Sequence, residues 1–334
     1  MKLEPFSLPL VRPLKTAAGT IETREGFLVR VRIDGVEGMG EATPLPGWTE
    51  SLSVCERALR AVNDPRSALE DDELSETPAA RHGLSLAVLD AAARIADEPL
   101  YRHLGGAGRS ERVPVNATVG DGTPDETAAA AEAAKTTGYP AVKLKVGNRE
   151  PAADVDRLEA VRRRCPDIEL RIDANGAWTD DTAGRLLPTL SELDVAVLEQ
   201  PLSAGELSDH ARLRGRGVEI ALDESVVREG VDAVLSANAA DLLVCKPMAL
   251  GGIDRAHEAI ETAGDAGTDT IVTTTIDGAI ARAGAIHLAA SISDIRPSGL
   301  ATGDLLGSDL RSDVGEVDRG SIAVPQGKGN IPRR

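Results

Sequence analysis

Lysine is scarce in this sequence, with seven lysines against 30 arginines among 334 residues. Acidic residues outnumber basic ones by 54 to 37, which gives a formal net charge of −17. Nucleic acids and anionic membranes attract positively charged surfaces, so this balance argues against both as partners. An acidic, lysine-poor surface is typical of halophilic proteins, because salt screens the repulsion between like charges. We therefore predict a halophilic acidic protein, although a GC-rich genome would also favour arginine over lysine.

Cysteine is equally sparse, and long apolar runs are missing. Cys55, Cys165 and Cys245 have no C-x-x-C spacing and cannot all pair, so we expect buried free thiols in a reducing compartment. The sequence has no signal-peptide hydrophobic region, and no apolar run approaches the roughly 18 residues that a membrane span requires. These absences predict a soluble, cytoplasmic protein.

Aromatic residues are few as well, with two each of Trp, Tyr and Phe. Trp48 lies in a loop rich in glycine and proline, residues 40–48, and we predict that it forms a pocket wall rather than part of the core. A second glycine-containing loop, residues 16–20, ends at Thr20. Both loops belong to the first part of the chain.

The first part of the chain has the pattern of a small α+β unit. Residues 27–33 alternate between apolar and polar, Asp34-Gly35 is a hairpin turn signal, and residues 36–41 return as a second strand. With residues 3–10 they predict an antiparallel sheet, and helices are predicted over 51–62 and 78–96. We assign residues 1–108 to an N-terminal domain and expect residues from about 318 to 334 to return to it, with a strand near 320–324.

From residue 113 the pattern changes to regular alternation of strands and helices. Eight strands with seven intervening helices predict a (β/α)8-type barrel over residues 109–317, in which the eighth helix is short. A doubly wound parallel sheet is the alternative, but no G-x-G-x-x-G follows the first strand. The strands are predicted at 113–119, 141–146, 168–173, 195–199, 218–222, 241–246, 269–274 and 297–301. The helices are predicted at 124–137, 151–164, 180–191, 206–214, 229–236, 252–265 and 277–291.

Acidic residues end three successive strands of this predicted barrel: Asp173, Glu199 and Asp223. Catalytic groups of barrels lie at the carboxyl ends of the strands, and neighbouring strands are about 4.8 Å apart, so three carboxylates there can converge on one ion. Oxygen ligands without His or Cys suit a hard cation, which predicts Mg²⁺, with Mn²⁺ as the alternative. The simpler interpretation is that these acids are ordinary helix N-caps.

Three of the seven lysines flank this acidic set. Lys143 and Lys145 lie two apart on the strand before it, and Lys246 ends the strand after it. A lysine beside a divalent cation and a second lysine has its ammonium form disfavoured, so it becomes a usable base at neutral pH. The pattern predicts abstraction of a proton next to a metal-bound carboxylate. A solvated edge strand is the alternative, although Lys143 and Lys145 alternate with apolar residues.

Five short motifs contain these residues in order: Lys143-Leu-Lys145, Asp173-Ala-Asn-Gly176, Glu199-Gln-Pro201, Asp223-Glu-Ser225 and Lys246-Pro247. They are similar to the motifs of the enolase superfamily, muconate-lactonizing-enzyme subgroup, and the resemblance covers nearly the whole chain. It implies a modified barrel with an N-terminal capping domain. The subgroup shares these motifs among cycloisomerases, dipeptide epimerases and o-succinylbenzoate synthases.

Three further stretches resemble the o-succinylbenzoate synthase family. Residues 23–26 with 40–47 are similar to its capping-domain loop, and residues 273–278 are similar to the hydroxyl-rich segment that holds the succinyl carboxylate of its substrate. Residues 302–305 lack the D-x-D pair with which many dipeptide epimerases hold an α-ammonium group. The resemblance therefore implies a lyase that dehydrates 2-succinyl-6-hydroxy-2,4-cyclohexadiene-1-carboxylate to 2-succinylbenzoate in menaquinone biosynthesis. A dipeptide epimerase or muconate-type cycloisomerase is the alternative, followed by a ligand-binding barrel without turnover.

The resemblance also implies a role for each residue. Asp173, Glu199 and Asp223 bind Mg²⁺, Lys145 removes the α-proton and returns it to the leaving hydroxide, and Lys246 stabilises the enediolate. Lys143 modifies the basicity of Lys145. The implied partner is a small-molecule carboxylate, and whether the protein forms a homo-oligomer is left open. Asn175 and Glu224 are implied to lie next to the metal-binding and catalytic residues and to support them. The implied substrate pocket comprises Thr20, Trp48, Thr274, Thr275 and Gly303.

Overall fold

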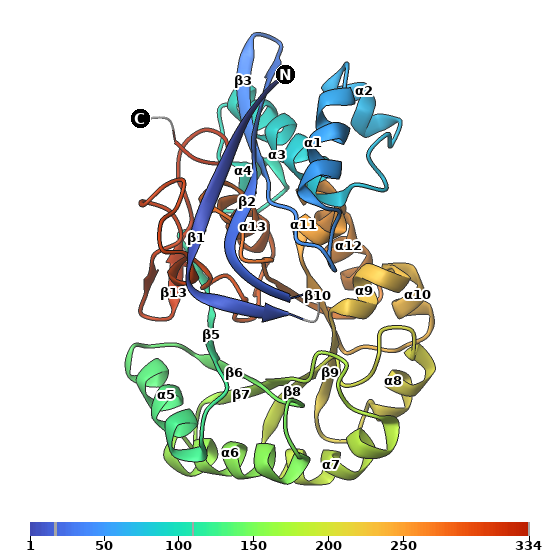
Figure 1. Ribbon diagram of the computed structural model, residues 1–334, viewed down its shortest axis with the longest axis vertical. Coiled ribbons are helices and arrows are strands. Elements are labelled where there is room, and N and C mark those ends of the chain that lie inside the picture. Colours follow the sequence, from blue (N-terminus) through green and yellow to red (C-terminus); the bar gives the residue numbers. More distant parts are fainter. Residues whose placement is uncertain (17–18, 109, 333–334) are drawn as a thin grey trace.

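The computed structural model describes residues 1–16, 19–108 and 110–332, and it has two parts (Figure 1). The upper part in Figure 1 is an antiparallel sheet of β1 (Lys2–Thr16), β2 (Gly19–Ile33) and β3 (Val36–Ala42). The predicted hairpin turn has positive φ at both Asp34 (50°) and Gly35 (82°), as a type I′ turn requires. The first strand is longer than the predicted 3–10, because it pairs with β2 along almost its whole length.

Four helices follow this sheet and complete what we call the cap, β1–β3 with α1–α4. They are α1 (Leu52–Ala61), α2 (Pro65–Glu70), α3 (Pro78–Ile95) and α4 (Leu100–His103). The helix α3 is buried on most sides, because it packs against the cap sheet on one face and the barrel on the other. Its approach to β3 is so close that glycine is required: a Cβ atom on Gly40 would overlap the carbonyl oxygen of Gly83.

Replacing Gly40 by alanine should therefore destabilise the protein by about 1–3 kcal/mol, the range for overpacking a closed core. The measurement is the urea-induced unfolding midpoint. The same change at Gly264, in an exposed part of a later helix with nothing within 4 Å of the added Cβ, is the matched control. It should be neutral or stabilising, because alanine has a higher helix propensity than glycine. Equal unfolding midpoints for both variants would contradict the packing argument.

The lower part is the barrel, a parallel sheet of seven strands in the order β5 to β11, with helices on its outer face (Figure 1). The predicted strand at 113–119 is divided at Val115 into β4 (Arg112–Pro114) and β5 (Asn116–Val119). The remaining elements are α5 (Pro124–Thr136), β6 (Ala141–Lys145), α6 (Pro151–Arg164), β7 (Glu169–Asp173), α7 (Asp180–Glu192), β8 (Val195–Glu199), α8 (Leu207–Leu213), β9 (Glu219–Leu222), α9 (Glu224–Glu229), α10 (Val231–Ser236), β10 (Leu242–Cys245), α11 (Pro247–Leu250), α12 (Ile253–Asp265), β11 (Asp269–Val272) and α13 (Ala279–Ser291).

The eighth strand, predicted at 297–301, is wrong as a regular strand. This segment forms two isolated parallel bridges, Val115 with Ser298 and Thr273 with Gly299, which link the two edges of the seven-stranded sheet. Pro297 has no N–H to donate, and Gly299 contributes no side chain to the packing, so the segment does not extend into a regular strand. In the described residues that follow, the 3₁₀ turn η1 (Gly303–Leu305) stands where the short eighth helix was predicted. The predicted (β/α)8-type barrel with an α+β cap is otherwise confirmed.

The short helices α9 and α11 were not predicted. The first begins directly after Asp223 and the second directly after Lys246. Each is too short to show the helical repeat of apolar residues from which longer helices were predicted. Each of these helices directs the chain away from the sheet immediately after a charged residue.

The C-terminal segment contacts both parts. Its strand β13 (Ser321–Ala323) lies between β12 (Val317–Asp318) and β4, so its partner is β4 rather than the cap sheet. Further along, the backbone N–H of Asn330 donates to Asp90 of α3 at 2.6 Å. The boundary at residue 108 stays a prediction.

The interior of the barrel and the cysteines complete the fold. A small apolar cluster from β8–β11 fills one side of the barrel: Val197, Ala221, Leu242, Val244 and Ile271. All three cysteines are buried and unpaired, as predicted. Among the residues that the structure describes, we find no helix with the length and apolar character needed to cross a membrane.

Candidate active site

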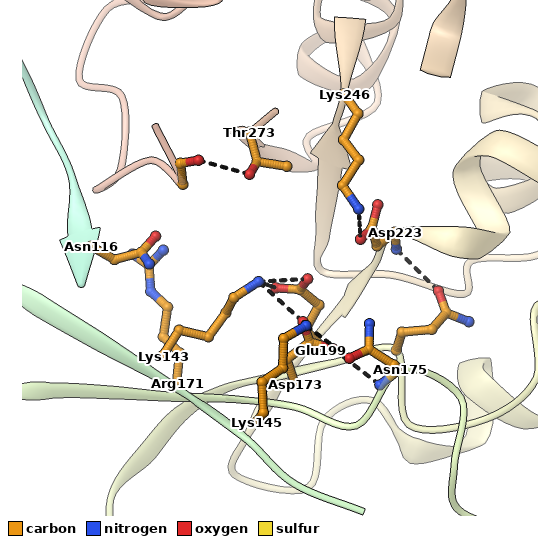
Figure 2. A network of polar contacts seen from close by, with 12 residues as sticks. Asn116, Lys143, Lys145, Arg171, Asp173, Asn175, Glu199, Asp223, Lys246 and Thr273 are labelled. Carbon is orange, nitrogen blue, oxygen red and sulfur yellow. Dashed lines mark hydrogen bonds and ion pairs between the residues drawn. The ribbon is translucent and has the colours of Figure 1, made fainter. Parts of the chain in front are cut away.

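The carboxyl ends of adjacent strands bring the predicted charged residues together (Figure 2). In the register of the sheet, Lys145 on β6 is level with Asp173 on β7, and Asp173 is level with Glu199 on β8. Asp223 follows the last residue of β9, and Lys246 follows the last residue of β10. Lys246 approaches the acids from the side opposite to Lys145, as Figure 2 shows. One end of the barrel therefore presents all of these groups to the same space.

The three carboxylates are almost inaccessible to water, and each is paired with a lysine. Lys143 Nζ lies 2.8 and 2.9 Å from the two oxygens of Glu199 and 3.1 Å from Asp173 Oδ2. Lys145 Nζ donates to the same Asp173 oxygen at 2.5 Å, and Lys246 Nζ pairs with Asp223 Oδ2. Such charges remain buried only because opposite charges surround them.

The lysines differ in their access to solvent. The Lys145 side chain is 37 % exposed, whereas those of Lys143 and Lys246 are 15 % and 11 % exposed. Lys145 is therefore the lysine best placed to meet a molecule that enters the barrel mouth. Its ammonium group also donates to Asn175 Oδ1 at 2.8 Å, and Asn175 Nδ2 donates to Glu224 at 3.1 Å. Asn175 thus contacts Lys145 directly, and Glu224 contacts Asn175.

Burial and the neighbouring charges both shift the pKa values of these groups. Burial raises the pKa of Glu199, and the neighbouring charge of Asp173 raises it further. For Asp173, burial acts upward, but the ammonium groups of Lys143 and Lys145 outweigh it and lower the pKa. For Lys143, burial acts downward, but the charges of Glu199 and Asp173 raise the pKa overall. Lys143 is therefore a permanent cation that balances the acids rather than a base.

Two buried side chains that the sequence did not single out hold this geometry. Gln200 accepts hydrogen bonds from the backbone N–H groups of Asp223 and Ser225 at 3.0 and 3.1 Å, and so links the ends of β8 and β9. Arg157 of α6 donates to the carbonyl oxygen of Lys145 at 2.8 Å and to that of Gly120 at 3.0 Å. These contacts fix the backbone under the lysine and the acids. In the sequence, Gln200 could have been identified from its position inside the Glu199-Gln-Pro201 motif, whereas nothing indicated Arg157.

The donor set fits a hard cation. Asp223 occupies the N-cap position of α9 but makes no side-chain cap hydrogen bond, so the simple helix-cap interpretation fails for it. Its buried Oδ1 has no hydrogen-bond partner, and neither has Glu224 Oε2. Within the described part of the chain, no three acidic, histidine or cysteine side chains form a ready metal cluster, because the lysines lie between the carboxylates. Carboxylate oxygens from three adjacent strands are nevertheless the ligands that Mg²⁺ prefers.

The predicted pocket residues of the cap lie at different distances from this centre. Trp48 contacts the site directly, since Lys246 Nζ stands 3.4 Å from the centroid of its ring. Thr20 lies at the exposed start of β2. The loop predicted at 16–20 includes Ala17 and Ala18, which fall outside the described residues. The role of these positions in a substrate pocket stays a prediction.

The predicted pocket residues of the barrel are engaged with one another and with neighbours. Thr274 Oγ1 and Thr302 Oγ1 share a hydrogen bond of 2.9 Å, and the hydroxyl of Thr275 donates to Asp277 at 2.5 Å. Gly303 packs against the guanidinium group of Arg282. Thr274 and Thr275 are both buried, so a ligand would meet them only at the inner end of the site.

The cap is fastened to the barrel next to this segment. The buried carboxylate of Glu41 accepts the backbone N–H groups of Gly278, Ile280 and Ala281 at 2.7, 3.1 and 2.9 Å, so it caps α13 from another part of the chain. Arg24 donates to the carbonyl oxygen of Ile276 at 3.1 Å. Burial raises the pKa of Glu41 to about 7, and the charge of Asp277 contributes.

This shift predicts a pH-dependent stability. The pKa of Glu41 is higher in the folded protein than its ordinary value, so its contribution is present at low pH and is lost as the pH rises through about 7. Between pH 6 and pH 8.5, the unfolding free energy should fall by about 1 kcal/mol more in the wild type than in Glu41→Gln, which cannot ionise. Urea unfolding of both proteins at both pH values, in the same buffer and metal concentration, measures this difference. Parallel pH profiles would contradict it.

Comparison with known proteins places the chain among enzymes. Residues 126–330 match the family model described as enolase C-terminal domain-like, and residues 1–91 match the model of the MenC N-terminal domain. An o-succinylbenzoate synthase of Thermobifida fusca is 33% identical over 307 residues, which cover 90% of this chain and 81% of that protein.

Two epimerases are also similar. The L-Ala-D/L-Glu epimerase of Bacillus subtilis is 30% identical over 310 residues, 87% of this chain and 84% of that protein, and its substrate-liganded structure superposes with a TM-score of 0.89 over 99% of this chain and 97% of that one. A dipeptide epimerase of Methylococcus capsulatus, complexed with Mg and the dipeptide L-Arg-D-Lys, is 27% identical, with a TM-score of 0.87 and coverage of 99% and 98%. The comparisons thus include both a lyase and isomerases.

Proposed function

The chain belongs to the enolase superfamily, and on that premise we propose that it is an o-succinylbenzoate synthase. The pair of lysines, Lys145 and Lys246, on opposite sides of three acids at the barrel mouth supports abstraction of an α-proton, which the synthase shares with epimerases. The observation that carries the choice of the synthase is the match of residues 1–91 to the MenC N-terminal domain. The substrate would be 2-succinyl-6-hydroxy-2,4-cyclohexadiene-1-carboxylate, and the product 2-succinylbenzoate, a precursor of menaquinone.

The residues divide the chemistry between them. Asp173, Glu199 and Asp223 would hold Mg²⁺, or Mn²⁺ as the alternative, and the bound ion would acidify the α-proton by withdrawing charge from the substrate carboxylate. Lys145, as a neutral amine, takes the proton from the carbon that bears the carboxylate, and the electron pair moves into an enediolate. Collapse of the enediolate breaks the adjacent C–O bond. The same lysine returns the proton to the departing hydroxide, so water leaves from the face that lost the proton.

Lys246 lies against the opposite face of the substrate. Its ammonium group supplies positive charge where the enediolate develops, and burial strengthens that attraction. Lys143 stays protonated and balances the charges of Glu199 and Asp173. Under the same proposal, the substrate is a small dicarboxylate and the enzyme is cytoplasmic. Neither nucleic acid nor a membrane is a partner.

A dipeptide epimerase is the second candidate, and a specific observation favours it. An epimerase needs one lysine on each face of the α-carbon, which is the arrangement of Lys145 and Lys246. The similarity to the Bacillus subtilis epimerase points the same way. Against it, the segment 302–305 has a single acid, Asp304, which is exposed, in place of the D-x-D pair with which many dipeptide epimerases hold an α-ammonium group.

One substrate panel separates the two candidates. The purified protein with Mg²⁺ is supplied with the cyclohexadiene carboxylate, with L-Ala-L-Glu-type dipeptides and with cis,cis-muconate, each at low and high salt. We expect 2-succinylbenzoate to form, as measured by chromatography and mass. Exchange of a dipeptide α-proton with deuterium from solvent, without dehydration of the first substrate, would establish the epimerase instead. Binding without turnover of any of them would favour a ligand-binding barrel.

A further inference from the structure

Lys246 has two neighbours that determine where its ammonium group points. One is the carboxylate of Asp223, to which it donates a hydrogen bond. The other is the indole of Trp48, whose ring centroid lies 3.4 Å from Lys246 Nζ. The face of an indole carries partial negative charge, and it attracts a cation most strongly when both groups are shielded from water. The Lys246 side chain is 11 % exposed and the indole is half-buried, so the contact is shielded mainly on the side of the ammonium group.

The loop that carries Trp48 is rigid by itself. The carbonyl oxygen of Leu45 accepts the N–H groups of Trp48 and Thr49, both at 2.9 Å, and the Thr49 hydroxyl accepts the N–H of Leu45 at 2.8 Å. Gly47 has φ of 102°, which a residue with a side chain would adopt only with strain. The turn therefore has one favoured shape and presents the indole without help from the lysine.

Both ends of this loop are fixed to the cap. Arg24 donates to the carbonyl oxygens of Thr43 and Pro44 at 2.9 and 3.0 Å. At the other end, the carboxylate of Glu50 accepts the N–H groups of Ala79 and Ala80, in the first turn of α3, at 3.0 and 2.8 Å. The position of the indole is thus set by the cap, whereas the position of Lys246 is set by the barrel.

Behind the indole lies open space. A cavity of about 460 Å³ is lined by Trp48 together with residues of α9–α12, among them Val226, Ala249, Leu250 and Arg255. Trp48 lines this cavity and also contacts Lys246, which does not line it, so removal of the indole is expected to open the surroundings of the lysine to solvent. The ammonium group would then gain water and further rotamers, and it would no longer be held toward the barrel mouth.

We propose that Trp48 is a positioning residue for Lys246: the cap supplies an aromatic face that holds the lysine of the barrel in its catalytic orientation. The role of Lys246 in turnover rests on the proposed function, but the contact itself does not. The inference assigns to the cap a part in the reaction beyond covering the substrate. It also predicts that loss of the π face is more harmful than loss of volume.

The experiment compares three substitutions. Trp48→Phe keeps an aromatic face, Trp48→Leu keeps apolar bulk without it, and Trp48→Ala removes both. With whichever substrate the panel identifies, we expect kcat to fall roughly 10- to 100-fold in Trp48→Leu and Trp48→Ala, with a smaller change in KM. Trp48→Phe should recover most of that loss. Equal losses in the Phe and Leu variants would overturn the proposal.

A second measurement does not depend on turnover. In protein labelled with ¹³C-lysine, the Cε methylene protons of Lys246 should resonate upfield because they adjoin the Nζ that stands over the indole, and Lys246→Arg identifies their signal. The upfield shift should persist in part in Trp48→Phe and vanish in Trp48→Leu, while the Lys145 signal stays in place. An unshifted Lys246 signal in the wild type would overturn the contact, whatever the substrate. A shifted signal without turnover would refute the proposed function alone.

Discussion

Replacement of Lys145 by alanine is expected to reduce turnover by about 1,000-fold or more, since general base catalysis contributes roughly 10²- to 10⁴-fold. Lys145 is the most exposed of the three lysines of the site and the one level with Asp173 and Glu199 in the sheet. Lys143 cannot take over, because the acids around it keep it protonated. The measurement is kcat/KM with the substrate identified by the panel.

The matched control is the same change at Lys135, on the outer helix α5. Its side chain is 42 % exposed, close to that of Lys145, and it pairs with Asp167 at 3.5 Å on the surface. Lys135→Ala should leave kcat/KM within about 2-fold of the wild type, because exposed ion pairs contribute little. Both variants should bind the substrate, which isothermal titration can verify. Turnover by Lys145→Ala at the rate of the control would refute the assignment of the base.

Replacement of Asp223 by asparagine is expected to abolish the dependence on Mg²⁺ together with at least about 99 % of the activity, a loss of the size seen when a charge-stabilising group is removed from a transition state. The carboxylate is buried, and its Oδ1 has no hydrogen-bond partner, so a cation is the natural partner for that oxygen. In the wild type, EDTA should remove the activity and Mg²⁺ should restore it.

A thermal unfolding assay tests the same site without the reaction. An ion that binds only the folded protein raises its stability by an amount set by the ion concentration relative to its dissociation constant. Mg²⁺ should therefore raise the melting temperature of the wild type and of Asp232→Asn, a control on the exposed face of α10, but not that of Asp223→Asn. A wild type indifferent to both EDTA and Mg²⁺ would refute the metal site.

The sequence could predict the charged centre because the centre depends on local order alone. In a parallel barrel, a residue at the end of a strand lies at the catalytic mouth whatever the loops do. The spacing of Lys145, Asp173, Glu199, Asp223 and Lys246 therefore sufficed to bring them together, while their roles in catalysis stay predictions. The same reasoning identified the cap, since its hairpin is also a local feature.

The groups that hold the centre in place could not be predicted in this way. Arg157 bonds to Gly120, 37 residues earlier, and Glu41 caps a helix that starts more than 230 residues later. Such contacts depend on how distant elements pack, and no periodicity in the chain encodes them. The eighth strand was wrong as a regular strand because Pro297 has no N–H to donate and Gly299 has no side chain to pack, and its pairing stops at two bridges.

The predicted pocket residues also differ in how far the sequence could indicate their contacts. Thr274 and Thr275 were selected for their hydroxyl groups, but those hydroxyls already bond to Thr302 and Asp277. Trp48 was selected because it is one of few aromatic residues and lies in a loop rich in glycine and proline, and it does contact the site. The residue type and its loop were visible in the sequence, whereas the hydrogen-bond partner of Thr274 depends on how separate segments pack.

The capping of α13 by Glu41 has a consequence for the order of folding during synthesis. Glu41 leaves the ribosome among the first residues, yet the backbone N–H groups that it caps belong to residues 278–281. Until those residues are made, the cap offers this buried acid the hydroxyl of Thr43 but none of its three backbone donors. Domains usually fold in order of synthesis. In this protein the first part to emerge can be completed only by the last.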